Sequence, residues 1–181
     1  MNTPTLVASS SPASQYVLAK TEQVVANYNF KANDGAVTIK EIEFTITNPK
    51  TITSITVGEV SRDVNDEKVN ISGLNIPVPA TYSGVSVPVK VTYNTVGFGG
   101  GAESNTASKV SISKVKYSAG NLTLTESISP AVAANQMTIV GGLPMVDLNA
   151  STRSGLSAGT TLLAEVTVSA LSNGGPIQVT E

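Results

Sequence analysis

The residues best able to bind a ligand form one short acidic stretch. It contains four oxygen-bearing side chains, those of Asp63, Asn65, Asp66 and Glu67. Carboxylate and amide oxygens are the ligands that Ca²⁺ prefers, so this stretch is the candidate cation site. Lys68 stands where a calcium loop usually has a glycine for its sharp turn. A solvated acidic loop without a bound cation is the alternative interpretation.

Few residue types in this chain could support catalysis. Histidine and cysteine are absent, which excludes a Ser–His–Asp triad, a cysteine nucleophile and an ordinary zinc site. Glu41 and Glu43 share one face of an alternating segment, as a pair of glycosidase carboxylates would. That face is the solvent face, and no aromatic platform for a sugar accompanies it. We therefore expect no enzymatic activity and no cofactor apart from the candidate Ca²⁺.

Composition limits the possible partners. The chain has 181 residues and a net charge of −2, which is too small to indicate binding to nucleic acid or to an anionic membrane. No apolar run is long enough to span a bilayer. Two loops, Ser61–Lys68 with its acidic residues and Gly97–Ser104 with Phe98, could instead bind a carbohydrate or a protein.

Hydrophobic alternation predicts strands along the chain. Alternate residues from Val24 to Ala32 are apolar or aromatic, a period of two that is typical of a strand with one buried side. The next segment, Ala36–Thr47, changes parity near Lys40-Glu41, which predicts a β-bulge. Asn33-Asp34-Gly35 between them predicts a hairpin turn. Such strands, separated by turn signals throughout, predict an all-β antiparallel sandwich.

Three further features refine this expectation. Ser83–Val96 alternates clearly, but Pro88 cannot donate to a ladder, so this strand is expected at an edge or bulged. Val110–Tyr117 and Leu122–Glu126 predict a hairpin. Ile128–Ala134 is expected to be a connector with, at most, a helical turn.

The sequence also contains an approximate internal repeat. Leu18–Ala32 is similar to Leu156–Ala170, and Asn2–Val7 is similar to Asn135–Val140 at a slightly shorter spacing. The period, about 135 residues, is that of a whole domain and too long for a solenoid unit. We therefore predict a module over residues 1–140 and a partial second copy over residues 141–181.

The joint between the copies resembles a known kind of protein. The stretches NQMTIVGGLPMVDL and SGLSAGTTLLAEVTVSA resemble junctions between tandem immunoglobulin-like modules of very large bacterial surface proteins. Gly159-Thr160 matches the Gly-Thr of that pattern, whereas Lys20-Thr21 in the first copy departs from it. The resemblance implies an immunoglobulin-like fold, an extracellular or cell-surface location and a structural role in a surface layer, stalk or filament.

The partial copy leaves three arrangements open. Its strands could fold back onto residues 1–140, could belong to a module that continues beyond them, or could complete a sheet in another chain by β-strand addition. The expected partners are accordingly copies of the same chain or adjacent modules of the same protein. Adhesion to a carbohydrate or host protein through the loops is the alternative function.

Overall fold

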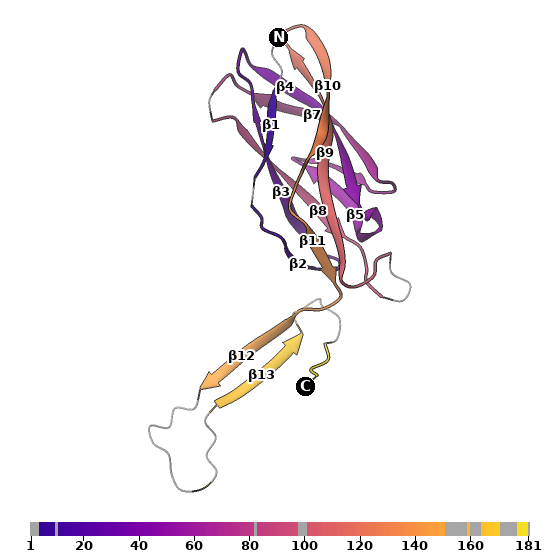
Figure 1. Ribbon diagram of the computed structural model, residues 1–181, viewed down its shortest axis with the longest axis vertical. Helices are drawn as coiled ribbons and strands as arrows, with labels where there is room; N and C mark the ends of the chain where they lie inside the picture. Colours follow the sequence, from indigo (N-terminus) through magenta and orange to yellow (C-terminus); the bar gives the residue numbers. More distant parts are fainter. Residues whose placement is uncertain are drawn as a thin grey trace.

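The chain forms a β-sandwich and a separate pair of strands (Figure 1). The computed structural model describes residues 4–9, 11–81, 83–97, 101–150, 159, 164–170 and 177–180. The strands are β1 (Thr5–Ala8), β2 (Gln15–Leu18), β3 (Glu22–Lys31), β4 (Val37–Thr47), β5 (Ile52–Val57), β6 (Val60–Asp63), β7 (Lys68–Val78), β8 (Val85–Tyr93), β9 (Thr106–Ala119), β10 (Leu122–Ala133), β11 (Met137–Val140), β12 (Pro144–Ala150) and β13 (Ala164–Ala170). A short 3₁₀ turn, η1 (Pro49–Thr51), precedes β5.

Two sheets enclose the core. The first has the strand order β1-β3-β8-β5-β6, and the second has the order β2-β11-β9-β4-β7, with β10 also paired to β9. Within these two sheets, the described strand pairs are antiparallel except for the parallel pair of β2 with β11. The predicted all-β sandwich is therefore confirmed. None of the described residues forms a helix long and apolar enough to cross a bilayer.

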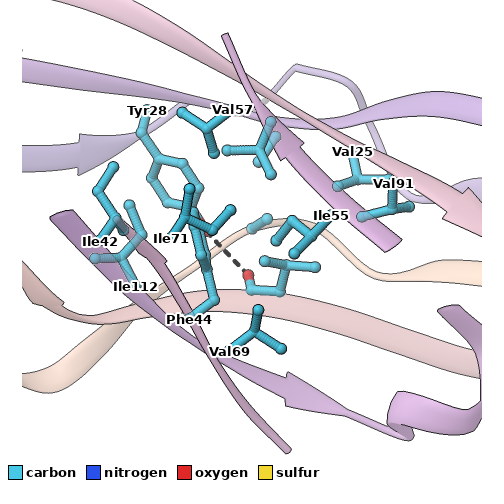
Figure 2. Close-up of a cluster of buried hydrophobic side chains, with 14 of the residues drawn as sticks. Val25, Tyr28, Ile42, Phe44, Ile55, Val57, Val69, Ile71, Val91 and Ile112 are labelled. Carbon is cyan, nitrogen blue, oxygen red and sulfur yellow. Dashed lines mark hydrogen bonds between the residues drawn. The ribbon is translucent and has the colours of Figure 1, made fainter. Parts of the chain in front are cut away.

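The core is built from the inward positions of both sheets. Tyr28 of β3 and Phe44 of β4 meet across it, with ring centroids 6.5 Å apart. Aliphatic side chains surround them, because alternate residues of each strand point to the same face. Figure 2 shows the two sides in contact: Val25, Tyr28, Ile55, Val57 and Val91 from the first sheet, and Ile42, Phe44, Val69, Ile71 and Ile112 from the second.

Two bulges adjust which residues enter the core. The register of β4 shifts between Ile39 and Glu41 against both of its neighbours, so the predicted bulge is confirmed. A second shift, in β3, lies between Val24 and Ala26. Val25 is the inserted residue there, and it is buried whereas Val24 is only half-buried. The prediction that Val24 belongs to the buried face is wrong for this reason.

Two predictions about the segments that connect the strands are wrong. Asn33–Gly35 does not close a hairpin, because β3 pairs with β1 and β8 whereas β4 pairs with β7 and β9. It carries the chain from one sheet to the other. Ile128–Ala134 is not an irregular connector, since β10 extends through Ala133 and pairs again with β9 at Val132 after a register shift.

Pro88 lies in the half of the central strand β8 that is paired on one side only. β8 lies between β3 and β5, so it is not an edge strand. Its pairing with β5 begins only at Val89, opposite Val57, whereas Pro88 faces Asn27 of β3. The half of β8 that contains the proline therefore has one described neighbour, which satisfies the constraint that a proline cannot donate to a second ladder.

Two buried tyrosines differ in their hydrogen bonding. Tyr28 Oη donates to the carbonyl of Val110 at 3.0 Å, and burial raises the pKa of this hydroxyl above its ordinary range. Burial raises the pKa of the Tyr93 hydroxyl as well, with Ser108 opposing the shift. Within the described residues, however, the Tyr93 oxygen makes no hydrogen bond of ordinary geometry.

This contrast predicts opposite outcomes for matched substitutions. Tyr28→Phe should lower the free energy of unfolding by about 1 kcal/mol, the net value of one hydrogen bond. The loss stays modest because the Val110 carbonyl still accepts the Ala134 N–H at 2.9 Å. Tyr93→Phe should leave stability unchanged or raise it, since it removes an unpaired buried polar atom. Urea unfolding measures both, and equal losses in the two variants would contradict the assignment.

Candidate interaction surface

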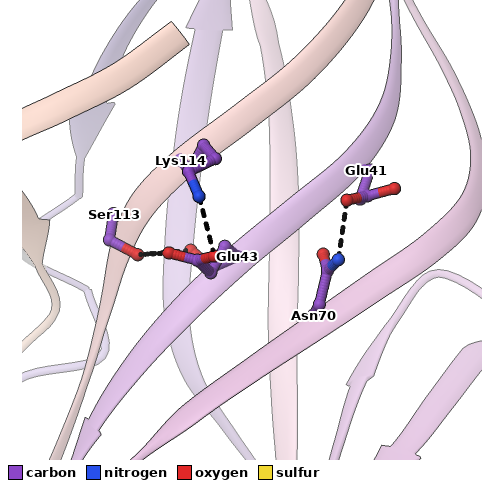
Figure 3. A network of polar contacts seen from close by, with 5 residues as sticks. All are labelled: Glu41, Glu43, Asn70, Ser113 and Lys114. Carbon is purple, nitrogen blue, oxygen red and sulfur yellow. Dashed lines mark hydrogen bonds and ion pairs between the residues drawn. The ribbon is translucent and has the colours of Figure 1, made fainter. Parts of the chain in front are cut away.

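Glu41 and Glu43 lie two residues apart on the outer face of β4 and are engaged by different partners (Figure 3). Glu43 accepts hydrogen bonds from Ser113 Oγ and Lys114 Nζ, both at 3.0 Å. Glu41 accepts one from Asn70 Nδ2 at 2.6 Å. Ser113 and Lys114 both reach Glu43 because Ser113 is the extra residue of a bulge in the β4–β9 ladder, which turns consecutive side chains to one face.

This arrangement does not give Glu43 the environment of a general acid. The Lys114 hydrogen bond is the main cause that lowers the pKa of Glu43, with burial opposing it and Ser113 adding to it. A general acid in glycoside hydrolysis needs the opposite, a raised pKa. The Glu41 and Glu43 side chains therefore act as cross-strand links on the outer face of the second sheet.

The acidic stretch lies at the connection from β6 to β7. Asp63 ends β6, and the side chains of Asn65, Asp66 and Glu67 are all exposed. Backbone bonds fix the loop, from Val64 N–H to the Thr53 carbonyl and from Ile46 N–H to the Glu67 carbonyl. In the part of the chain that the structure describes, no three acidic residues come close enough to hold a metal ion. Calcium binding here stays a prediction.

The two loops that could bind a ligand meet at one hollow, which we call the loop-end hollow. It has a volume of about 670 Å³. The first loop contributes Glu67 and the second contributes Glu103, while Lys50 lies on a third side. Phe98, the aromatic residue expected to support binding, lies outside the described residues. The hollow thus carries both signs of charge.

The β12–β13 pair presents an uncovered apolar surface. Val146 pairs with Val168 and Leu148 pairs with Val166, so the four side chains share one face of the pair. We call this the hairpin face, and its exposed fractions are 61% for Val146, 41% for Val168, 68% for Leu148 and 59% for Val166. The opposite face is mostly polar, with Asp147 and Glu165 among its residues. An amphipathic two-stranded sheet of this kind is at best marginally stable alone in water.

The register of this pair matches that of β1 with β3. In the sandwich Leu6 pairs with Phe30, and in the separate pair Val146 pairs with Val168. Phe30 and Val168 are also counterparts in the internal similarity of Leu18–Ala32 to Leu156–Ala170, whereas Leu6 and Val146 are slightly further apart in sequence. The two pairs therefore place apolar residues at matching positions.

The pairing of β1 has its parallel in β12, whereas the sequence similarity relates β1 to β11. The predicted counterpart of Asn2–Val7 was Asn135–Val140, which contains β11. In the structure β11 lies inside the sandwich between β2 and β9, whereas β1 is an edge strand paired to β3. The strand with the pairing of β1 is β12. The similarity of Asn2–Val7 to Asn135–Val140 thus relates strands with different neighbours.

A second candidate surface lies where the edges of the two sheets meet. β1 ends the first sheet, and among the described residues β10 of the second sheet pairs with β9 alone. Between them lies an open cavity of about 270 Å³, and we call this region the β1–β10 seam. Its apolar lining comprises Leu6, Phe30, Val115, Ile128 and Val132, and Glu126 and Ser127 lie at the same cavity.

Comparisons with protein-family models, with curated proteins and with solved structures return no match.

The Glu43 contacts predict a pH dependence of stability. Because the pKa of Glu43 is lowered in the folded state, its contribution is present above the unfolded carboxyl pKa and is lost as pH falls through the folded pKa. Glu43→Gln should lower the free energy of unfolding at pH 7 by about 0.5 kcal/mol, the scale of a cross-strand pair. The difference from the wild type should disappear in acid below both pKa values.

Urea unfolding across the acid range measures this dependence. Glu59→Gln is the control, since Glu59 is exposed in the turn between β5 and β6 and should show no such pH-dependent loss. A constant difference between Glu43→Gln and wild type at every pH would refute the electrostatic explanation.

Proposed function

We propose that this chain is a structural module of an extracellular or cell-surface assembly, a building unit of a surface layer, stalk or filament. Its partners are β-modules, either copies of the same chain or adjacent modules of the same protein. The proposal includes an immunoglobulin-like classification of the sandwich and treats β12–β13 as the start of a second copy. It rests mainly on the hairpin face, which leaves four apolar side chains exposed on a strand pair with no other described sheet beside it.

The matching register supports this role. In the sandwich, the Leu6–Phe30 pair packs against the second sheet, and Phe30 is 1% exposed. The equivalent Val146–Val168 pair has no such cover among the described residues. Exposed apolar patches of this kind are typical of protein interaction sites, and unpaired strands associate readily by adding to another sheet.

Adhesion is the second candidate, and the loop-end hollow favours it. Lys50, Glu67 and Glu103 surround a space of about 670 Å³ between loops. Charged and polar groups converging on a hollow can orient a polar ligand such as a carbohydrate. The hollow and the hairpin face are built from different elements, so a chain could use both surfaces.

Light scattering tests the structural role. The wild-type chain should show a mass above its monomer value of 18.5 kDa that rises with protein concentration. Val166→Thr combined with Val168→Thr should return the mass to that of a monomer, since threonine keeps the β-branched shape but removes apolar surface. Thr56→Val, a substitution within β5 away from this face, is the control.

The same measurement with added Ca²⁺ tests the cation prediction separately. Association that depends on Ca²⁺ and is lost in Asp66→Asn would assign a role to the acidic loop. A wild-type chain that stays monomeric at every concentration, with and without Ca²⁺, would contradict assembly through the hairpin face.

A further inference from the structure

We propose that the β12–β13 pair of one chain docks on the β1–β10 seam of a second copy, with β12 adding along the free edge of β10 and the hairpin face covering the seam cavity. This inference rests on the proposed function, because it requires that copies of the chain associate. It specifies which two surfaces meet.

The chemical match follows from the equivalence of the two strand pairs. Leu6 and Phe30 line the seam cavity from the β1–β3 side. Their counterparts by register, Val146 and Val168, are exposed on the hairpin face. One side of the seam cavity is thus already formed by a strand pair of this type. Its remaining open space is bordered by Ile128 and Val132, apolar side chains that are only partly buried.

The first half of β10, Leu122–Ser127, is a regular edge segment, whereas beyond it the ladder shifts register and the strand contains Pro130. From Leu122 to Ser127 the ladder with β9 runs without a register shift, and Glu126 is the only charged residue in this segment. The side of β10 away from β9 has no strand partner among the described residues. A regular, sparsely charged edge is a template for another strand.

Two other sheet edges carry protective features. β7 is interrupted opposite β4, where Gly73 has a φ of +83°, and it begins with Lys68 and contains Pro77. β6 has only four residues, including Arg62 and Asp63. Bulges, prolines, charges and short length are the means by which proteins block edge pairing. Their concentration on these edges, and not on Leu122–Ser127, indicates β10 as the acceptor.

The placement of the two surfaces makes the contact intermolecular. Figure 1 shows β12 and β13 projecting from one end of the sandwich, whereas β1 and the start of β10 lie toward the other end, near the N-terminus. The pair therefore does not cover the seam of its own chain. Joining two different surfaces gives a heterologous contact, which produces a ring if it closes and a filament if it does not.

Disulfide trapping tests the match, because the chain has no cysteine of its own. Leu148→Cys on the hairpin face and Ile128→Cys at the seam are made as separate chains and mixed under mild oxidation. The mixed 148–128 disulfide should form about tenfold faster than the product with Ser61→Cys, since docking raises the local concentration of the two thiols. Ser61 is the control acceptor, exposed on the opposite edge strand β6.

The products distinguish failure of this inference from failure of the proposed function. Association by light scattering together with a dominant 148–148 disulfide would show that hairpin faces pair with each other, which overturns docking at the seam but keeps assembly. Equal trapping at positions 128 and 61 would also overturn it. A monomer throughout would overturn both proposals.

Hydrogen exchange of the wild-type chain gives a second test that requires no substitution. Raising the protein concentration should slow exchange about tenfold at those amides of Leu122–Ser127 that point away from β9, once most chains are associated. Amides of Val60–Asp63 should not change. Concentration-dependent protection confined to β13, with none in β10, would overturn the assignment even if Ile128→Cys failed to fold.

Discussion

Coverage of every apolar strand face by a second sheet is the constraint on which this structure depends. The requirement arises because a strand exposes alternate residues on each face, and an apolar face left in water forfeits the hydrophobic stabilisation of burial. In the sandwich it is met closely: Phe44 and Ile71 of one sheet and Tyr28 and Ile55 of the other are all fully buried. Figure 2 shows the aliphatic and aromatic side chains of the two sheets in contact at this interface.

The bulges follow from the same constraint. An inserted residue would turn the rest of its strand inside out unless the parity of the sequence changed with it. In β4 the apolar residues change parity at Lys40, where the register shifts, so Ile39 and Ile42 both face inward. In β3 the shift brings Val25 and Ala26 into the core together. On the outer face, the bulge at Ser113 gives Glu43 its two partners.

Alternation and turn residues predicted most strands, because both are local signals. They predicted β3, β4, β8 and the β9–β10 hairpin. They did not predict β2 or the separation of β5 from β6, where strands of four residues carry too few alternations to stand out. Pairing was less predictable than strand formation. Asn33–Gly35 reverses the chain, but a turn signal does not state whether the flanking strands join one sheet or two, and the order of the strands depends on contacts distant in sequence.

The candidate surfaces were likewise only partly predictable from the sequence. The sequence indicated that Leu156–Ala170 is similar to the alternating segment Leu18–Ala32, and it indicated the two candidate loops separately. It did not indicate that these loops meet at Glu67 and Glu103, or that Leu6 and Ile128 border one cavity, because each of these contacts joins residues far apart in the chain. The register that pairs Val146 with Val168 and Leu6 with Phe30 was likewise visible only in the structure.

Magnitudes help to decide how the hairpin face is covered. Fully burying a valine or leucine gives about 1.5–3 kcal/mol, and these four side chains are between 41% and 68% exposed, so their complete burial offers about 5 kcal/mol. Association costs about 4–15 kcal/mol in lost freedom. Burial of one hairpin face therefore reaches only the lower end of this cost, and further contacts are required.

Stacking two hairpin faces would double the burial but leave the outer edges of all four strands unpaired. Docking at the seam adds backbone hydrogen bonds along Leu122–Ser127, each worth about 0.5–1.5 kcal/mol net, and also covers Ile128 and Val132. It therefore satisfies two deficits at once, the uncovered face of one copy and the open edge of the next. Face stacking satisfies only the first, which is why the seam is the better acceptor.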